Sequence, residues 1–405
     1  MTFSLPLEYQ IFRSKASTRL NIFVDNLLFS CYDNDNGSVH GHMANNQRVT
    51  IKHVAKEAGV STQTVSRVIN QRPDVSPETR KRVLQIIEHL GFSPSALARS
   101  LIQRRSYTLG VVTAGLKYIG PSRTLNGITH KAQELGYALL LTELPSFNTN
   151  NITPLLQSLL SRHIDGIIWA VPEIGDNRAW LEEHIPTPPI PMIFLTMQIR
   201  PGVPVVSFDN QLGGRMATRH LIEEGCKRIG HLSGPLDWWE ARQRKEGWQQ
   251  TLLEAGLQVN DQHWSEGNWS STSGEKAFKQ LMATYPEMEA VFVANDQMAL
   301  SVLQIACQQG IRVPQDLAVV GFDGIAEAAY FWPPLTTVYQ DQHSLGCKAV
   351  EELVKNIETI KGGEELKEPH STFLKPELIV RESSSVKDTH GLKKNKISRK
   401  NPINA

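Results

Sequence analysis

From Thr108 onward, short apolar runs alternate with amphipathic segments, and this alternation is the strongest constraint on the fold. The runs that predict strands are LGVVT, YALLLTEL, DGIIWA, PMIFLT, VVSFD, RIGHLSG, AVFVAND and LAVVGFD. Helices are expected between them, and several end at a glycine, namely Gly136, Gly225, Gly256 and Gly310. Strands that alternate with helices form a parallel sheet covered on both faces. Roughly ten strands exceed one typical sheet, so we expect two doubly wound α/β lobes with a cleft between them.

The segment 49–92 follows a different pattern and predicts three short helices. Thr50 and Ser61 are placed to cap IKHVAKEA and TQTVSRVIN, and Gly59 supplies a tight turn between these two helices. Ser76, followed by a proline and an acid, marks the start of a third helix. The apolar face of that helix carries Val83, Ile86, Ile87 and Leu90. These features indicate a small all-α domain ahead of the α/β lobes.

Positive charge is concentrated in this N-terminal part of the chain. Residues 44–105 contain eleven Lys and Arg against four Asp and Glu, a net of +7, whereas the whole chain has a net charge of +1. The remaining residues therefore carry a net charge of about −6. A basic block attached to a near-neutral body indicates a module that binds a polyanion, although a solvated surface face would give the same count.

The stretch GVSTQTVSRVIN, residues 59–70, is the most informative part of the basic block. It is dense in Ser and Thr, and its only charged residue is Arg67. Gln63 can pair bidentately with adenine, Arg67 can pair with guanine, and Thr62 can meet a thymine methyl group. A helix–turn–helix with such a face can enter the major groove of DNA, but a plain helical hairpin has the same shape. The pattern alone leaves both interpretations open.

A longer match bears on this choice. The segment VTIKHVAKEAGVSTQTVSRVINQRPDVSPETRKRVLQIIEHLGFSPSALARSL resembles the DNA-binding headpiece of the lactose-repressor (LacI/GalR) family without a gap. The later stretches GPLDWWEARQRKEGW, VFVANDQMAL, AVVGFDG and PPLTTVYQD are similar to the same family. The resemblance runs from Val49 to about Glu382 and does not cover residues 1–43 or the tail. It implies a periplasmic-binding-protein-like core whose two lobes close on a small ligand.

The resemblance also assigns residues to a DNA interface. The positions that read base edges in the major groove are occupied by Thr62, Gln63 and Arg67. The positions that hold phosphates are occupied by Thr50, Ser61, Thr64, Ser66 and Asn70. Leu101 matches the hinge-helix leucine that wedges into a base step of the minor groove, with Ala98 packed beside it; core packing under the linker is the alternative for Leu101. Ser95 replaces the asparagine often found in this hinge motif, and Arg104 and Arg105 are further phosphate candidates.

In the core, effector contacts are expected on loops at the strand ends. Arg244, Trp269, Asn295 and Asp323 match sugar-contacting positions of the family, and Gln340 ends a neighbouring strand. Carboxylates and Arg form paired hydrogen bonds with vicinal hydroxyls, and an indole stacks on the apolar face of a sugar ring. Asp296, which follows Asn295, is expected to cap the next helix.

Two features bear on the identity of the effector. Thr196 stands where sugar binders of the family can carry an acid, which weakens any claim for a particular sugar. Trp238 and Trp239 resemble residues of regulators that respond to β-linked disaccharides such as cellobiose or β-galactosides. Either tryptophan could instead cover the outer face of its lobe, so the sequence leaves the disaccharide as one candidate.

Other classes of function find no support. There is no GxSxG, HExxH, Walker or GxGxxG motif, and His231 is expected in the core, so we expect no enzyme and no cofactor. The four cysteines lie far apart and form no CxxC, so neither a disulfide framework nor a metal site is expected. No apolar run approaches a membrane span and no signal peptide is visible. A cytoplasmic, nucleoid-associated protein is therefore expected, without contact to a membrane.

These observations give a plan of the domains. Residues 1–43 are expected to be a poorly ordered extension, with Met43 as a possible native start, and residues 384–405 a disordered basic tail. The headpiece is expected at 44–92, the hinge helix and linker at 93–107, and the core at 108–383. Within the core, lobe 1 is expected at about 108–208 and 341–368, and lobe 2 at about 209–338 and 369–383.

The expected function follows from this plan. We expect a sequence-specific DNA-binding transcription regulator, a repressor that binds double-stranded operator DNA as a homodimer. A small sugar held between the lobes would control its affinity for the operator. The lack of a heptad repeat in the tail favours a dimer over a tail-mediated tetramer. An activator or corepressor-type regulator of the same family is one alternative, and a sugar-processing α/β enzyme is another.

Overall fold

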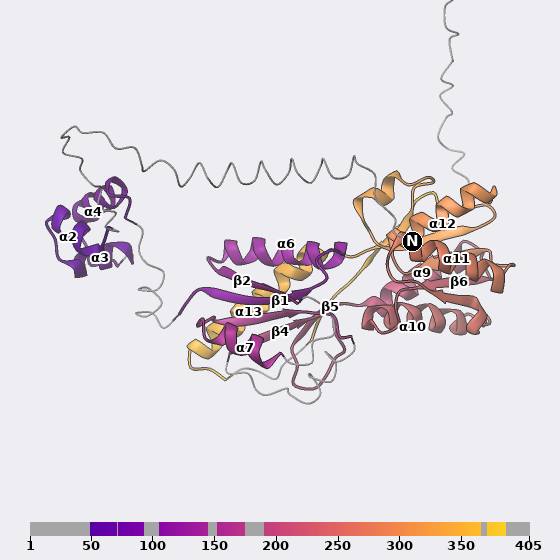
Figure 1. Cartoon of the computed structure of the whole chain (residues 1–405), viewed down its shortest axis with the longest axis horizontal. Coiled ribbons are helices and arrows are strands. Elements are labelled where there is room, and N and C mark those ends of the chain that lie inside the picture. Colours follow the sequence, from indigo (N-terminus) through magenta and orange to yellow (C-terminus); the bar gives the residue numbers. More distant parts are fainter. Residues whose placement is uncertain are drawn as a thin grey trace, which may run out of the picture. The chain divides into compact units, whose positions relative to one another are not determined.

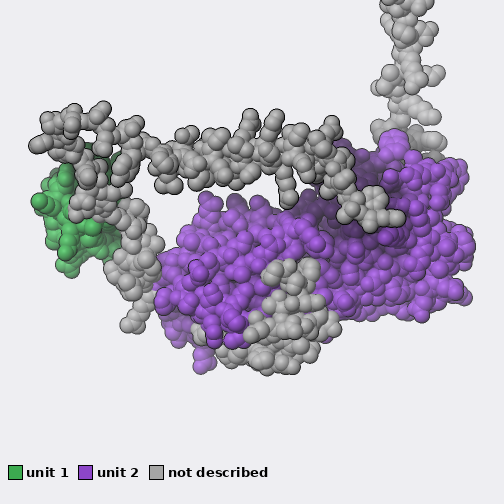
Figure 2. Space-filling model, in the orientation of Figure 1, with its two compact units in different colours: residues 1–94 green, residues 95–405 purple. Residues whose placement is uncertain are grey.

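A computed structural model describes most of the chain between residues 49 and 385. The described ranges are 49–70, 72–92, 105–144, 152–174, 190–365 and 371–385. The chain divides into two compact units, residues 1–94 and 95–405, which Figure 2 colours separately. The expected N-terminal extension, the basic tail beyond residue 385, and the hinge residues Ser95, Ala98, Leu101 and Arg104 lie outside the described residues.

The first unit carries the helices that the sequence predicts. They are α2 (Ile51–Ala58), α3 (Thr62–Ile69) and α4 (Pro77–His89), shown in Figure 1. Ser61 and Ser76 cap α3 and α4, each accepting a backbone N–H from three residues further on, at 3.0 and 3.3 Å. Gly59 ends α2 with a φ of 63°, a conformation that glycine adopts readily. The shared core of this unit includes Val54, Ala58, Val65, Val68 and Val83.

Lobe 1 is built on a six-stranded sheet with the strand order β11–β5–β4–β3–β1–β2. Its strands, all paired in parallel, are β1 (Thr108–Ala114), β2 (Ala138–Leu144), β3 (Gly166–Ala170), β4 (Met192–Leu195), β5 (Val205–Phe208) and β11 (Thr372–Leu374). Helices α6 (Ile119–Glu134) and α13 (Gln342–Lys361) cover one face, and α7 (Thr153–Leu160) packs on the other (Figure 1). Leu109 and Val111 pack under α6 and α13, whereas Val112 packs with α7, as strand alternation requires.

Lobe 2 contains a second six-stranded sheet, with the order β12–β10–β9–β8–β6–β7. Its strands are β6 (Ile229–Ser233), β7 (Trp264–Glu266), β8 (Ala290–Val293), β9 (Ala318–Asp323), β10 (Thr336–Tyr339) and β12 (Glu377–Ile379). The β10–β12 pair is antiparallel and the other pairs are parallel. One face packs on α9 (Asn210–Glu223) and α10 (Trp239–Glu254), and the other on α11 (Ser271–Thr284) and α12 (Asp296–Gln309). Short 3-10 helices η1 (Asp261–His263) and η2 (Ala326–Tyr330) complete the lobe.

The chain passes between the lobes between β5 and α9, between β10 and α13, and between β11 and β12. The first two passages lie at residues 208–210 and 339–342, and the third contradicts the expected boundary. Residues 369–383 were all expected in lobe 2, whereas β11 pairs in parallel with β5 of lobe 1, Thr372 opposite Val206. The third passage therefore falls between Leu374 and Glu377. A three-residue edge strand has too few alternating positions to reveal its sheet from sequence.

Two further expectations can be compared with the structure. His231 is a core residue, as predicted: it lies fully buried on β6 between the rings of Trp248 and Phe292, and burial lowers its pKa to about 3. Arg105 was expected to meet phosphate, but in the structure its guanidinium bonds Tyr137 and Glu358 of lobe 1. Across the described ranges, no helix has the length and apolar character needed to cross a bilayer.

Candidate functional site

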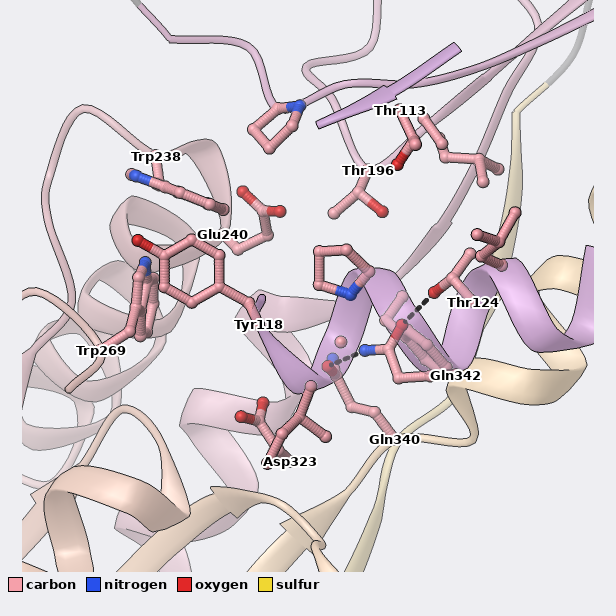
Figure 3. Close-up of a pocket in the computed structure, with 18 of the residues that line it drawn as sticks. Thr113, Tyr118, Thr124, Thr196, Trp238, Glu240, Trp269, Asp323, Gln340 and Gln342 are labelled. Carbon is pink, nitrogen blue, oxygen red and sulfur yellow. Dashed lines mark hydrogen bonds between the residues drawn. The ribbon is translucent and has the colours of Figure 1, made fainter. Parts of the chain in front are cut away.

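A pocket lies between the two lobes at the carboxyl ends of the parallel strands, where α/β sheets bind ligands. Lobe 1 contributes residues that follow β1 and β4, and lobe 2 contributes residues that follow β8, β9 and β10. Figure 3 shows the lining, with an aromatic side formed by Tyr118, Trp238 and Trp269. Among the described residues, the charged side chains that line it, Glu240, Arg244 and Asp323, all come from lobe 2.

Arg244 of α10 is the centre of the polar network in the pocket. It is 5% exposed, and its Nε donates to Asn210 Oδ1 at 2.9 Å. Nη1 meets Asp323 Oδ1 at 3.2 Å, and Nη2 donates to Gln340 Oε1 at 3.3 Å. Gln340 in turn donates to Asn210 Oδ1 at 3.1 Å. The predicted residues Arg244, Asp323 and Gln340 are therefore brought together, on a scaffold of three elements and with fixed geometry.

Burial governs the ionisation of this network. Removal from water lowers the pKa of Arg244, and Asp323 offsets part of that effect. Burial likewise raises the pKa of Asp323, against the opposing pull of Arg244. Each group thus stabilises the charged form of the other, so loss of either would leave an uncompensated buried charge.

Asn295 lines the pocket, but the described structure already uses its amide. Asn295 Oδ1 accepts the backbone N–H of Met298 at 2.9 Å and caps α12, and its Nδ2 donates to the Trp269 carbonyl at 2.9 Å. The expectation that Asp296 caps this helix is wrong. Asn295 has the extended backbone of a cap (φ −153°, ψ 163°), whereas Asp296 lies inside the helix. The Asp296 carboxylate accepts from Ile325 N at 2.8 Å and Thr337 Oγ1 at 2.6 Å, tying α12 to the sheet.

An aromatic wall of Tyr118, Trp238 and Trp269 forms one side of the pocket. Trp238 contacts Tyr118 and Trp269 edge to face, with ring centroids 5.8 Å apart in both pairs. Gly234 makes room for this wall, because a Cβ there would lie 2.1 Å from the Trp269 ring. Of the two tryptophans singled out in the sequence, Trp238 lines the pocket and Trp239 does not.

Backbone strain marks the same place. Trp269, Asp323 and Thr196 line the pocket with φ values of 72°, 99° and 53°, in the left-handed region that side chains rarely occupy. Strain of this kind costs of the order of 1–3 kcal/mol per residue and tends to collect at ligand sites. Its presence on both lobes supports a ligand site between them.

Three buried polar atoms of residues that line the pocket lack a hydrogen-bond partner among the described residues. They are Thr113 Oγ1, Glu240 Oε2 and Trp269 Nε1. An unsatisfied buried polar group costs about 1–3 kcal/mol. Burial also raises the pKa of Glu240 to about 7. A ligand whose hydroxyl groups offer a donor to Glu240, an acceptor to the indole N–H and a partner to the Thr113 hydroxyl would remove these deficits.

Lobe 1 presents neutral groups opposite this wall. Thr113, Thr124 and Thr196 line the pocket, and Figure 3 shows Thr124 bonded to Gln342. Thr124 Oγ1 donates to Gln342 Oε1 at 2.9 Å, and Gln342 Nε2 donates to Gln340 Oε1 at 3.2 Å, which links both lobes. Sequence reasoning missed Tyr118, Thr113, Thr124, Glu240 and Gln342. Their signal is positional only: Thr113 lies near a strand end, Gln342 lies at a crossover, and Tyr118, Thr124 and Glu240 lie at or near the start of a helix that follows a strand.

In the first unit, α3 presents the predicted face. Val65 and Val68 are buried, whereas Thr62, Gln63 and Arg67 are exposed. Arg67 forms an exposed ion pair with Asp74 at 3.4 Å, a contact worth little in water. Some of the expected phosphate contacts have local partners: Ser61 bonds Thr64, and Asn70 Nδ2 donates to the Ser66 carbonyl at 2.8 Å.

Comparison with known proteins fits this geometry. The model of bacterial regulatory proteins of the lacI family matches residues 50–95, and that of the periplasmic binding protein-like domain matches residues 218–384. The ribose operon repressor of Escherichia coli (strain K12) is 35% identical over 309 residues, which cover 76% of this chain and 93% of the repressor. The chain belongs to the LacI family.

Solved structures of LacI-family proteins extend the likeness to the fold. The Lac repressor dimer bound to operator and the anti-inducer ONPF superposes with a TM-score of 0.73 at 30% identity, covering 84% of this chain and 99% of that one. The complex of the regulator CelR with cellobiose gives a TM-score of 0.61 at 32% identity, covering 83% and 100%. The chain is thus a DNA-binding transcriptional repressor of the LacI family with a ligand-binding core, and not an enzyme.

Proposed function

We propose that this repressor binds a pseudopalindromic operator as a homodimer and that a small sugar between the lobes controls its affinity for that operator. The observation that carries the proposal is the interlobe pocket, which combines a buried Arg244 network with an aromatic wall. Such a combination suits a ligand with several hydroxyls and an apolar ring face. We also propose that the protein is cytoplasmic and associated with the nucleoid.

The DNA contacts proposed for the headpiece follow its exposed groups. Arg67, Gln63 and Thr62 would read base edges from α3, and Arg67 would exchange its ion pair with Asp74 for a guanine. Phosphates would be held by Thr50, Ser61, Thr64, Ser66 and Asn70. Leu101 and Ala98 would act at the minor groove.

For the effector, a β-linked disaccharide is the first candidate. Trp269, Trp238 and Tyr118 form a cluster of three rings with two edge-to-face contacts, which would suit a ligand with more than one apolar ring face. The regulator CelR, 32% identical to this chain, was solved in complex with cellobiose. A pentose is the second candidate, because the ribose operon repressor is 35% identical to this chain.

The homodimer finds support in a surface feature of lobe 2. Tyr330 and Trp332 are 88% and 84% exposed on the segment that leads from η2 to β10. Exposed aromatic residues two positions apart are typical of a surface that is covered in an assembly. The Lac repressor with 30% identity was solved as a dimer on its operator.

Control would operate as coupling between two sites. Sugar binding would favour one arrangement of the lobes and thereby weaken operator binding, so operator DNA would weaken sugar binding by the same factor. A ligand that strengthens operator binding is the alternative sign. The crossovers support coupling, because Asn210, Gln340 and Gln342 lie where the chain changes lobe and also line the pocket.

The test is a binding titration with the DNA that flanks the protein's own gene, against a shuffled sequence of equal length. Wild-type protein should prefer the native DNA, and one of cellobiose, lactose or ribose should reduce that affinity. Arg67→Ala should lose about 1–3 kcal/mol of discrimination, roughly 5- to 150-fold. Arg82→Ala, an exposed arginine on α4, is the matched control and should keep the discrimination. Equal affinity of the wild type for both DNAs would contradict the proposal.

A further inference from the structure

Outside the pocket, three side chains with metal-ligating atoms converge on lobe 1. His130, His343 and Cys347 bring one ligand atom each to within 4.8 Å of one another. His130 lies on α6, whereas His343 and Cys347 lie on α13 four residues apart, a spacing that puts both on one face of the helix. We propose that this cluster binds a transition-metal ion of the Zn²⁺ type and thereby links α6 to α13.

The distances suit a tetrahedral ion. Cys347 Sγ lies 3.6 Å from His343 Nδ1. With a Zn–N distance of about 2.1 Å and a Zn–S distance of about 2.3 Å, a tetrahedral angle puts the two donors roughly 3.6 Å apart. The ring centroid of His130 is 5.4 Å from that of His343. Since His130 is exposed, its imidazole can move inward by rotation of the side chain.

The backbone around the cluster is held closely. A Cβ added at Gly127 of α6 would lie 2.0 Å from the carbonyl oxygen of His343, so the two helices touch backbone to backbone beside the donors. Lys131, which follows His130, bonds Glu134 within α6 at 3.0 Å and Glu351 of α13 at 3.1 Å, and the second contact joins the two helices again. The donors of α13 therefore stand on a fixed frame, and binding would order little beyond the His130 side chain.

The donor set selects the class of metal. Two imidazoles and a thiolate suit Zn²⁺ or another borderline or soft ion, whereas Mg²⁺ and Ca²⁺ prefer oxygen ligands. Without metal, Cys347 Sγ donates to the Gly127 carbonyl at 3.5 Å, and burial raises its pKa while Lys131 opposes that rise. Metal binding would displace the thiol proton. Three protein ligands leave the fourth tetrahedral position to water.

The cluster lies on the helix pair that also forms part of the pocket lining. Gln342, which precedes His343, accepts the hydrogen bond from Thr124 of α6. An ion that fixes α6 against α13 would therefore act on the same pair of helices that carries this contact. The metal ion would therefore act on the pocket through these two helices. The existence of the metal site does not depend on which effector binds in the pocket.

The test uses the full chain, stripped of metal with a chelator and kept reduced, and titrated with Co²⁺ as a spectroscopic substitute for Zn²⁺. We expect a thiolate-to-cobalt charge-transfer band that saturates at one Co²⁺ per chain and is abolished by added Zn²⁺. Because His40 and His42 also occur in the chain, the thiolate band and not total cobalt is the readout. Zn²⁺ should also raise the unfolding temperature of the wild type.

Variants separate this site from other thiols and from simple misfolding. Cys347→Ser should lose the band and the response to Zn²⁺ while unfolding at the same temperature as metal-free wild type. His130→Ala and His343→Ala should each weaken Co²⁺ binding by more than about 100-fold, since loss of a direct ligand exceeds the effect of losing an outer partner. Cys307→Ser, on the exposed surface of α12, is the control and should keep the band. A wild type without the band, a band that persists in Cys347→Ser, or unchanged affinity in His130→Ala would overturn the proposal.

Discussion

The two lobes share one strand order but contribute different chemistry to the pocket between them. Among the described residues, lobe 2 supplies every charged lining side chain, Glu240, Arg244 and Asp323. Lobe 1 lines the pocket with apolar side chains, Tyr118, three threonines and Gln342. Equal folds therefore do not imply equal roles, because function depends on the side chains at the strand ends.

We therefore expect the two lobes to contribute differently to ligand binding. In lobe 2 the side chains of the Arg244 network are buried and already bonded to one another, so that this part of the site is formed before any ligand arrives. Lobe 1 offers single hydroxyls whose contribution depends on closure over the ligand. We expect substitutions in lobe 2 to remove binding and substitutions in lobe 1 to adjust it.

The largest effect is expected for Arg244→Ala in lobe 2. Truncation removes the donor to Asn210 and Gln340 and leaves Asp323 without its cation, so sugar affinity should fall by about 4 kcal/mol, near 1000-fold. Titration calorimetry measures this loss of sugar affinity. Arg219→Ala, an exposed arginine on α9, is the matched control. Arg244→Lys retains a charge but not the planar fork, and it should also bind weakly; wild-type affinity in that variant would contradict the role of the network.

A smaller effect concerns the stability of lobe 2 against pH. Burial raises the pKa of Asp296, next to the charge of Asp323, and that of Glu240, in each case to about 7. Between their ordinary values and about pH 7, the folded state holds protons that the unfolded state has lost. The free energy of unfolding should therefore fall as pH rises from about 4 to 7, by on the order of 3 kcal/mol for each group.

Denaturant titrations of the ligand-free protein at several pH values measure this dependence. Asp296→Asn cannot titrate, so its profile should be flatter than that of the wild type. Glu287→Gln, at an exposed position of lobe 2, is the control and should leave the slope unchanged. A wild-type stability that rises from pH 5 to 7 would show that these carboxyls are ionised in the folded state.

The smallest effect is expected for Thr196→Ala in lobe 1. Loss of one hydroxyl on the neutral lobe 1 side of the pocket should reduce sugar affinity by about 1 kcal/mol, roughly fivefold. Thr284→Ala, whose hydroxyl bonds main-chain carbonyls far from the pocket lining, is the control. A loss as large as that of Arg244→Ala would remove the distinction between the lobes.

Much of the fold was predictable because its signals are local. The caps at Ser61 and Ser76, the apolar strands and the glycine-ended helices each need only a few neighbouring residues. The strand β11 was assigned to the wrong lobe, because three residues do not specify their partner. The cap of α12 was assigned to Asp296 instead of Asn295, because two adjacent residues are both good caps and only the backbone angles distinguish them.

The candidate site was predictable in part, from the family resemblance for Arg244 and Asp323 and from its place at a strand end for Gln340. Arg244, Asp323 and Gln340 do meet, although they are up to 96 residues apart in sequence. Glu240 and Tyr118 were missed because nothing local indicates which side of a strand end faces the other lobe. The cluster of His130, His343 and Cys347 was not predicted from short cysteine motifs. The three residues meet only because α6 packs against α13 in the folded core.

The central claim is that ligand binding in the pocket and operator binding are coupled. The affinity for the sugar that releases the operator measures that coupling directly. Its Kd is determined by calorimetry with free protein and with protein saturated by operator DNA. The account predicts that operator weakens sugar binding by the same factor by which sugar weakens operator binding, typically 5- to 150-fold. A sugar whose binding requires Arg244 but whose Kd is the same with and without operator would contradict it.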